Sequence, residues 1–216
     1  MKRTLIVGDV HGCAQELEDL LDACRYSSDD RLIFAGDLVA RGPDSHGVVK
    51  LARKLKAEGV LGNHDAHVLK FHRGEQVGPH HVDVAKSLTR KDFEYLEGLP
   101  LWVDVPKFKL RVVHAGMVPG VKVEAQKPED LLNMRSLDAQ GNAKRRVSDG
   151  VPWASQWGGP ELLVFGHDAV RGLQEYPYAL GLDTGCVYGR RLTAVAFPGR
   201  VLISVPARKQ WCPIDE

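Results

Sequence analysis

The chain is poor in cysteine, in long apolar runs and in excess charge. Its four cysteines are scattered with no Cys-x-x-Cys pair, so neither a zinc knuckle nor a disulfide framework is predicted. No apolar run is long enough to span a bilayer, and the run at Thr4–Val7 is too short for the apolar region of a signal peptide. We therefore expect a cytoplasmic protein without a membrane partner.

The charge balance is nearly even. The formal net charge is +1, from 29 basic and 28 acidic residues. Proteins that hold long nucleic acids usually present a strongly basic face, so no stable nucleic-acid complex is expected. The one basic cluster, Lys144-Arg145-Arg146, is interpreted as a solvated loop. The near-even charge balance favours as ligand a small anion, or an anion that is bound at one local site.

The composition is that of an ordinary globular protein. The 216 residues are 44% hydrophobic and 26% charged, which suits one α/β domain. We predict a single domain over residues 1–216, with two loosely patterned insertions at about 66–108 and 117–160.

Six short apolar runs each lead into a glycine or histidine and then into a side chain that can bind a metal. Such runs, rich in leucine and β-branched residues, predict strands buried on both faces. They span residues 4–7, 32–35, 60–61, 110–113, 162–165 and 179–182. Apolar residues at helical spacing predict helices near 17–24, 48–55 and 89–96. This order indicates a layered α/β fold, and residues 191–197 and 200–205 predict a closing antiparallel hairpin.

The polar residues after these runs form a candidate metal site, because the strand ends of an open α/β sheet share one rim. The donors are two aspartates, three histidines and an asparagine: Asp9, His11, Asp37, Asn63, His114 and His167. Mixed oxygen and nitrogen donors suit transition metals better than Mg²⁺ alone. We predict two divalent ions, with Mn²⁺ preferred and Fe, Zn, Co or Ni as alternatives. Two ions about 3.5–4 Å apart need a bridging carboxylate, for which Asp37 is the candidate, and they activate a shared water as a nucleophile.

Three further residues complete the predicted chemistry. His64 follows Asn63 directly and is placed to protonate the leaving oxygen as a general acid. Arg41 lies four residues beyond Asp37 and offers a planar, two-pronged grip on phosphate oxygens. Arg135 is a second candidate grip. The pattern predicts a two-metal phosphoesterase.

Several of these segments resemble the calcineurin-like metallophosphoesterases of the phosphoprotein phosphatase group. They are residues 8–12, 36–42, 62–65, 114–116 and 166–167. The resemblance implies two facing mixed β-sheets flanked by helices. It implies one ion held by Asp9, His11 and Asp37, and a second held by Asp37, Asn63, His114 and His167. Substrate contacts are predicted from Arg41, Asn63, Arg135 and His67.

Within that group, residues 38–43, 62–67 and 182–186 resemble the bacterial symmetrical diadenosine tetraphosphatases. Protein Ser/Thr phosphatases carry Asp where this chain has Ala40, and usually Glu where it has Asp65. The resemblance implies that diadenosine tetraphosphate, or a related dinucleoside polyphosphate, is split symmetrically, into two ADP in the first case.

Two alternative functions stay open at this point. A protein Ser/Thr or Tyr phosphatase is favoured by the short stretch between His114 and His167, which would leave the site open to bulky substrates. A non-catalytic, metal-bound regulator would be expected to have lost ligands or the acid, whereas this chain has them all.

Some assignments are left as alternatives. With Ala40 in place of a carboxylate, His64 needs another orienting partner; Asp65, Asp168 and Asp183 are candidates, and Asp183 is preferred because it lies on the rim. Trp153 and Trp157 are interpreted either as core residues or as a shelf on which a nucleobase stacks. The remaining histidines are interpreted as surface or loop residues: His46, His72, His80 and His81.

Overall fold

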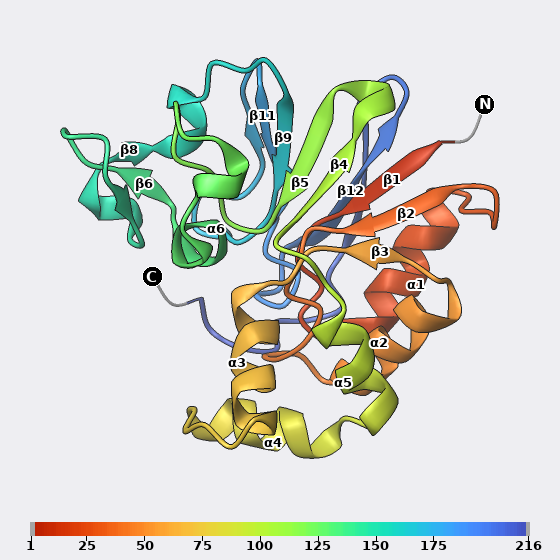
Figure 1. Cartoon of the computed structure of the whole chain (residues 1–216). Helices are drawn as coiled ribbons and strands as arrows, with labels where there is room; N and C mark the ends of the chain where they lie inside the picture. Colours follow the sequence, from red (N-terminus) through yellow and green to blue (C-terminus); the bar gives the residue numbers. More distant parts are fainter. Residues whose placement is uncertain (1–2, 215–216) are drawn as a thin grey trace.

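The first sheet contains the N-terminal strands and the closing hairpin. The computed structural model describes residues 3–214 (Figure 1). The strand order is β13 (Val201–Pro206), β12 (Arg191–Phe197), β1 (Thr4–Val7), β2 (Arg31–Phe34) and β3 (Glu58–Gly59). β1, β2 and β3 are parallel, whereas β12 runs antiparallel to both β1 and β13. The predicted hairpin is confirmed.

The third strand lies two residues earlier than predicted. The sequence suggested residues 60–61, but the ladder with β2 pairs Glu58 and Gly59. The N–H of Leu61 instead donates to the carbonyl of Pro100, outside the first sheet, at 2.8 Å. Val60 and Leu61 therefore follow the strand rather than form it.

The second sheet faces the first. Its strand order is β10 (Gln174–Glu175), β11 (Ala179–Gly181), β9 (Leu162–Phe165), β5 (Leu110–Val113) and β4 (Trp102–Val105). The three inner strands are parallel, and the edge strands β10 and β4 are antiparallel to their neighbours. The predicted fold of two mixed sheets flanked by helices is confirmed.

Three buried apolar clusters explain why the strands are apolar on both faces. In β1, Leu5 and Val7 pack toward the helices, whereas Ile6 packs against Val112 and Val164 of the second sheet. The far face of the second sheet forms a third cluster with residues of the segment after β5. Each sheet is thus covered on both sides, as the continuous apolar runs indicate.

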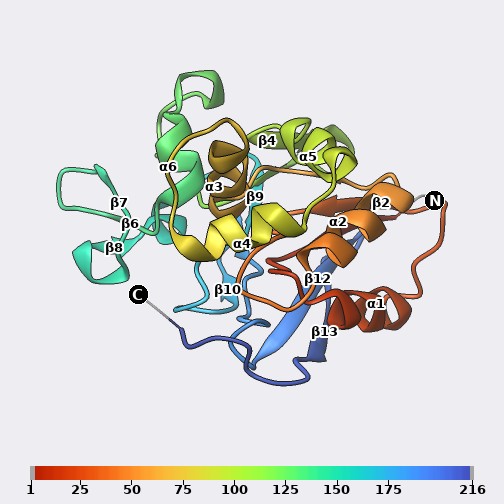
Figure 2. The ribbon, with the colours of Figure 1, turned by 90° about the horizontal axis from the view of Figure 1, so that it is seen from below.

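Helices follow the strands of the first sheet and make up most of the segment 66–108, and one more lies in the segment 117–160. The helices are α1 (Ala14–Ala23), α2 (Ser45–Lys54), α3 (Asn63–His72), α4 (Pro79–Ser87), α5 (Arg90–Glu97) and α6 (Pro128–Asn133). The predicted start of α5 is confirmed: Thr89 and Asp92 form a reciprocal capping box. The sequence analysis did not predict α4. Figure 1 shows α4 below α3, and Figure 2, seen from below, shows the two helices side by side.

The segment 117–160 adds α6 and a small sheet over the second main sheet. The small sheet has the order β7 (Ala143–Lys144), β6 (Ser136–Leu137) and β8 (Val151–Pro152). Short 3₁₀ turns lie at Pro106–Phe108, Val123–Ala125, Val147–Asp149 and Trp153–Gln156. None of the helices between residues 3 and 214 has both the length and the apolar character that a membrane crossing requires.

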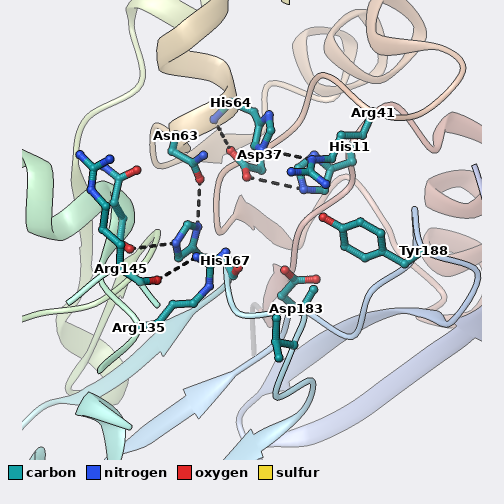
Figure 3. Close-up of a pocket in the computed structure, with 13 residues that line it drawn as sticks. His11, Asp37, Arg41, Asn63, His64, Arg135, Arg145, His167, Asp183 and Tyr188 are labelled. Atoms are coloured by element: carbon teal, nitrogen blue, oxygen red, sulfur yellow. Dashed lines mark hydrogen bonds and ion pairs between the residues drawn. The ribbon is translucent and has the colours of Figure 1, made fainter. Parts of the chain in front are cut away.

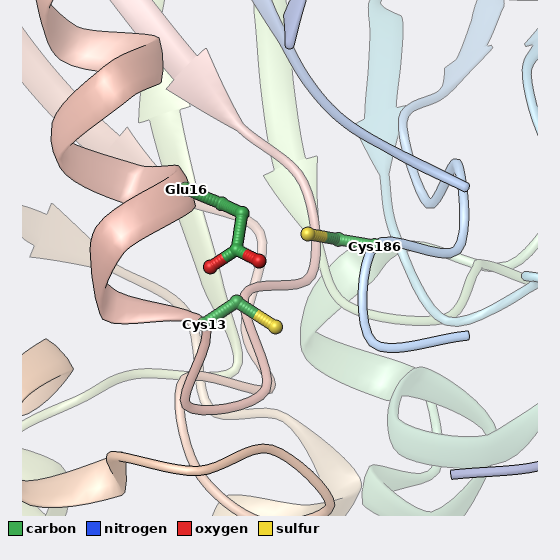
Figure 4. Close-up of side chains that lie close together, drawn as sticks. All are labelled: Cys13, Glu16 and Cys186. Atoms are coloured by element: carbon green, nitrogen blue, oxygen red, sulfur yellow. The ribbon is translucent and has the colours of Figure 1, made fainter. Parts of the chain in front are cut away.

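A buried cluster joins the start of α1 to the loop after β11. Figure 4 shows the thiols of Cys13 and Cys186 beside the carboxylate of Glu16. That carboxylate accepts a hydrogen bond from the backbone N–H of Arg208 at 3.1 Å. The adjacent Cys186 thiol and then burial raise the pKa of Cys13, so its thiol stays protonated. A protonated thiol packs as a small apolar group, and the Cys13 thiol packs in this way between the two loops.

Candidate metal centre and phosphate pocket

The structure brings all six predicted metal ligands together where the strands of both sheets end. Asp9 and His11 follow β1, Asp37 follows β2, and Asn63 opens α3. His114 and His167 follow β5 and β9 of the second sheet. Figure 3 shows several of these side chains converging on one pocket from separate elements.

Asp37 lies at the centre of this group. Two sets of donor atoms, each within 4.8 Å of one another, share its carboxylate: Asp9, His11 and Asp37 form one, and Asp37, His114 and His167 form the other. Its Oδ2 is 3.6 Å from Nε2 of His11 and 3.5 Å from Nε2 of His114. A carboxylate between two donor sets has the position that a bridging ligand requires.

Backbone carbonyls determine which ring nitrogen of each histidine carries the proton. Nδ1 of His11 is 3.2 Å from the carbonyl of Val39, and Nδ1 of His114 is 2.8 Å from that of Ala35. A carbonyl only accepts hydrogen bonds, so both Nδ1 atoms are protonated and both Nε2 atoms keep lone pairs. Such partners orient the histidine ligands of metal sites.

Three lone pairs on candidate ligands face one another with no proton donor between them. Nε2 of His167 is 3.1 Å from the carbonyl of Asn133, so this ring keeps its lone pair on Nδ1. That Nδ1 and Nε2 of His114 both lie 2.9 Å from Oδ1 of Asn63. Three acceptors thus face one another without a proton among them. A cation would satisfy this arrangement, and the residues therefore fit a metal ion.

Burial and mutual repulsion perturb the titration of the site. Burial, reinforced by Asp183 and Asp37, raises the pKa of Asp9 well above its usual range. Burial also raises the pKa of Asp37 to about 7. Conversely, it lowers the pKa of His11 to about 3 and that of His114 to about 4. Bound cations would reverse the cost of ionising the carboxylates.

Several of the candidate ligands have a strained backbone. His11, Asp37 and His167 have φ angles of 49°, 48° and 69°, in the left-handed region that side chains rarely adopt. Strain of this kind is retained at functional sites, where the surrounding structure enforces it. The preceding glycines make room: a Cβ at Gly36 would lie 2.6 Å from Nδ1 of His114, and one at Gly166 would lie 1.9 Å from Oδ1 of Asp9.

His64 lies beside this group, but no carboxylate orients its ring. Its Nε2 is 3.2 Å from Nε of Arg41, and its Nδ1 is 3.0 Å from Nε2 of His81. Its backbone N–H donates to Oδ1 of Asp37 at 2.9 Å. Among the described residues, no carboxylate hydrogen-bonds to the imidazole of His64. The assignment of Asp183 as its partner is therefore wrong, because the histidine of α4 occupies that position.

The candidate carboxylates have other roles. Asp183 accepts the N–H of Gly185 at 3.1 Å and lines the pocket. Asp168 pairs with Arg171 at 2.6 Å. Asp65 is fully buried and accepts three backbone N–H groups.

Asp65 ties the Asp37 loop to the start of α3. Its Oδ1 accepts the N–H groups of Leu38 and Val39 at 3.1 and 3.2 Å, and its Oδ2 accepts the N–H of Gly62 at 3.0 Å. Burial raises the pKa of Asp65 to about 7 despite these donors. The carboxylate thus fixes the spacing of two ligand loops.

A cavity of about 220 Å³ opens beside the candidate ligands. Arg41, Arg135, Arg145 and Tyr188 line it, and the guanidinium of Arg41 lies 5.4 Å from the centre of the Tyr188 ring. Arg145 is exposed and pairs with Glu129, as the interpretation of a solvated loop implies, and it also lines the pocket. His67 does not line the cavity; its Nδ1 contacts the carbonyl of Asn63 at 2.7 Å.

Arg135 holds the pocket together as well as lining it. One of its terminal nitrogens donates to the carbonyl of Arg145 at 3.0 Å, and the other donates to that of His167 at 3.1 Å. Its Nε, 3.9 Å from Oδ1 of Asp168, is buried without a hydrogen-bond partner. The guanidinium of Arg135 therefore connects His167, a candidate metal ligand, to the loop that contains Arg145.

Trp153 belongs to the core, and Trp157 is partly buried against it. Trp153 is 2% exposed, donates from Nε1 to the carbonyl of Ala115 at 3.0 Å and packs against Phe165. Trp157 donates to the carbonyl of Glu161 at 3.0 Å. Neither lines the cavity. The core interpretation is supported, and neither ring forms a shelf in this pocket.

Sequence reasoning missed His81, Arg145 and Tyr188. Tyr188 lies two residues beyond the Leu182–Cys186 segment, so that motif could have indicated it. His80, also taken as a surface residue, accepts the backbone N–H of Arg41 through Nε2 at 2.6 Å. The basic run Lys144-Arg145-Arg146 marks Arg145, but no local pattern places it or His81 at the pocket, because their positions depend on how the two insertions fold.

Facing mixed sheets with aspartates and histidines gathered at the strand ends define a class of metallophosphoesterases. A family model described as calcineurin-like phosphoesterase matches residues 2–191, and the chain belongs to this family of hydrolases. The resemblance found in the sequence is thereby confirmed.

The chain is also similar to individual proteins of this family. The chain is 30% identical to the asymmetrical bis(5'-nucleosyl)-tetraphosphatase PrpE of Oceanobacillus iheyensis, over 95% of this chain and 93% of the relative. It is 29% identical to the symmetrical bis(5'-nucleosyl)-tetraphosphatase of Aromatoleum aromaticum, over 94% and 97%. A crystal structure of a candidate diadenosine tetraphosphatase is 46% identical, with a TM-score of 0.90 over 95% of this chain and 94% of that one.

Proposed function

We propose that this chain hydrolyses dinucleoside polyphosphates with two divalent metal ions, and that it cuts diadenosine tetraphosphate into two ADP. The observation that carries the proposal is the position of Asp37 between two donor sets, beside a cavity lined by three arginines. A phosphate monoester offers one phosphate to such a pocket, whereas a polyphosphate chain offers several. The arginines therefore favour the longer anion.

The proposed ligands divide as the resemblance implies. Asp9, His11 and Asp37 would hold one ion, and Asp37, Asn63, His114 and His167 would hold the other. When bound, the ions would supply an activated water and neutralise charge at phosphorus. We propose Mn²⁺, with Fe, Zn, Co or Ni as alternatives, because the donors mix imidazole with carboxylate and amide oxygen.

The remaining chemistry belongs to side chains of the pocket. Arg41 binds phosphate oxygens through its planar fork, and Arg145 engages the phosphate chain from the opposite element. Arg135 keeps Arg145 next to His167. His64 donates a proton from Nε2 to the leaving oxygen, so the departing nucleotide does not leave as an unprotonated anion. With a soluble nucleotide as substrate, we propose the cytoplasm as the location.

The relatives support the substrate class more than the position of the cut. One is named an asymmetrical enzyme and another a symmetrical one, at almost equal identity. The symmetrical cut rests on the resemblance of residues 38–43, 62–67 and 182–186. Product analysis therefore decides between them.

The test incubates the purified chain with diadenosine tetraphosphate and Mn²⁺ and separates the nucleotides. ADP as the sole product supports the symmetrical cut; ATP with AMP overturns it but keeps the substrate class. A phosphopeptide at matched concentration tests the protein-phosphatase alternative, which would be supported by a higher kcat/KM. Turnover of neither substrate, with metal bound, would favour a non-catalytic regulator. Asp37→Asn serves as the inactive control.

A further inference from the structure

We propose that His81 is the positioning residue for His64: its Nε2 accepts the Nδ1 proton of His64 and so reserves Nε2 of His64 for the leaving oxygen. This inference rests on the proposed hydrolytic function. His81 does not line the cavity and would not touch the substrate. It would act only through the ring that it contacts.

The hydrogen-bond partners of His64 determine its tautomer. Nε of Arg41 is 3.2 Å from Nε2 of His64, and an arginine nitrogen can only donate. Nε2 of His64 is therefore the acceptor. A neutral imidazole carries one proton, so that proton is on Nδ1. It points to Nε2 of His81, 3.0 Å away, which must then supply the lone pair.

This chain of contacts has a consequence for catalysis. Because Nδ1 of His64 is already protonated and engaged, any further proton must go to Nε2. That nitrogen lies on the side of Arg41, which lines the pocket with His64. When Arg41 turns to a phosphate, Nε2 can take a second proton from solvent, and the doubly protonated ring then gives that proton to the leaving oxygen of the bound ester. Without an acceptor at His81, the ring could rotate or hold its proton on the wrong nitrogen.

Packing at the start of α4 holds His81 in place. Its ring stacks on that of His64, with centroids 5.1 Å apart and planes 28° apart, and it lies 4.9 Å from the ring of His67. The preceding residue, His80, binds the backbone N–H of Arg41. One turn of α4 thus fixes both the arginine and the histidine of the pocket.

Two substitutions separate the hydrogen bond from the packing. His81→Phe keeps a ring against His64 but has no acceptor, whereas His81→Gln retains an acceptor oxygen near the position of Nε2. Asp83→Asn, at an exposed position of the same helix, controls for general effects on α4. Each variant is assayed with diadenosine tetraphosphate, phenyl phosphate and 2,4-dinitrophenyl phosphate. The last has a leaving group that needs no proton.

General-acid catalysis contributes about 10²–10⁴-fold, so losing its orientation should lower kcat about 10- to 100-fold where the leaving group is poor. We expect the full loss for His81→Phe with phenyl phosphate, a smaller loss with diadenosine tetraphosphate because its ADP leaving group is less basic, and little change for the dinitrophenyl ester. His81→Gln should recover most of the loss. In a His64→Ala background, His81→Phe should cause no further loss, because two residues that act through one step are not additive. An equal loss with all substrates, or none, would overturn the proposal.

A second readout does not depend on turnover. Nitrogen-15 spectra of the metal-free protein should show the Nδ1-protonated tautomer of His64 in the wild type and in His81→Gln, but not in His81→Phe. An unchanged tautomer in His81→Phe would also refute the assignment. If the wild type hydrolyses none of the three esters, the proposed function fails, while the tautomer measurement still decides the role of His81.

Discussion

Replacing Asp65 with asparagine should weaken both the fold and the metal centre, although this residue is not a proposed ligand. The carboxylate accepts three buried backbone N–H groups, from Leu38, Val39 and Gly62. Asparagine keeps one oxygen for the first two and turns its amide toward the third. One buried N–H then loses its acceptor, which costs about 1–3 kcal/mol. Alanine would leave all three N–H groups without an acceptor at about 3–9 kcal/mol, a large part of a typical domain's stability.

The effect on the centre follows from what Asp65 connects. It joins the loop after Asp37 to the residue before Asn63, so its loss should loosen the spacing of two ligands. Outer partners of this kind typically contribute 10- to 100-fold in metal affinity. We expect Asp65→Asn to weaken Mn²⁺ binding by about that factor.

Urea unfolding of the metal-free protein and calorimetric Mn²⁺ titration measure the two effects. Both should be run near pH 8, above the pKa of about 7 of Asp65, so that the wild-type carboxylate is ionised. Asp92→Asn is the matched control: Asp92 is equally buried, caps α5 and pairs with Arg53, but lies outside the centre. It should lose stability and keep its metal affinity. Equal losses of affinity in both variants would refute the reasoning.

Three other outcomes are expected. His64→Ala should lower kcat on diadenosine tetraphosphate about 10²–10⁴-fold with unchanged metal content by elemental analysis; a metal-free variant would count against the acid role. Mn²⁺ affinity should fall about tenfold for each pH unit below the pKa of about 7 of Asp37, for each carboxylate that takes up a proton, and should level off above that pKa. The histidines should not contribute in this range, because the lowered pKa values of His11 and His114 keep their rings unprotonated. A loss of affinity only below pH 5 would contradict this. Trp153→Ala should cost about 3–5 kcal/mol in urea unfolding and leave KM unchanged, whereas a nucleobase shelf would raise KM instead.

The strand ends were predictable because their signal is local. Each ligand lies within a few residues of an apolar run that packs on both faces, as in β1 with Leu5 and Ile6. Glycine before Asp37 and His167 is explained by the close approach of neighbouring loops. The order of these segments along the chain was therefore enough to predict where the site lies, without knowledge of any tertiary contact.

The pocket's outer parts were not predictable in the same way. α4 has a weak apolar pattern, and only its fold-back under α3 brings His81 to His64. Arg145 follows the two-residue strand β7, whose place depends on its pairing with β6, and the carbonyl of Arg145 accepts a hydrogen bond from Arg135. These contacts join elements without any shared periodicity. Sequence reasoning therefore sought a carboxylate for His64 where the structure provides a histidine.

The two donor sets differ in their origin. Asp9, His11 and Asp37 all follow strands of the first sheet, whereas the set of Asp37, His114 and His167 spans both sheets. In the proposed centre, one ion is thus a local feature and the other is a cross-link between the two halves of the sandwich. The ion held by ligands from both sheets should be released once the two halves separate, whereas the ion held by the first sheet alone can stay bound. Unequal occupancy, or two different elements in one centre, is a natural outcome of this architecture.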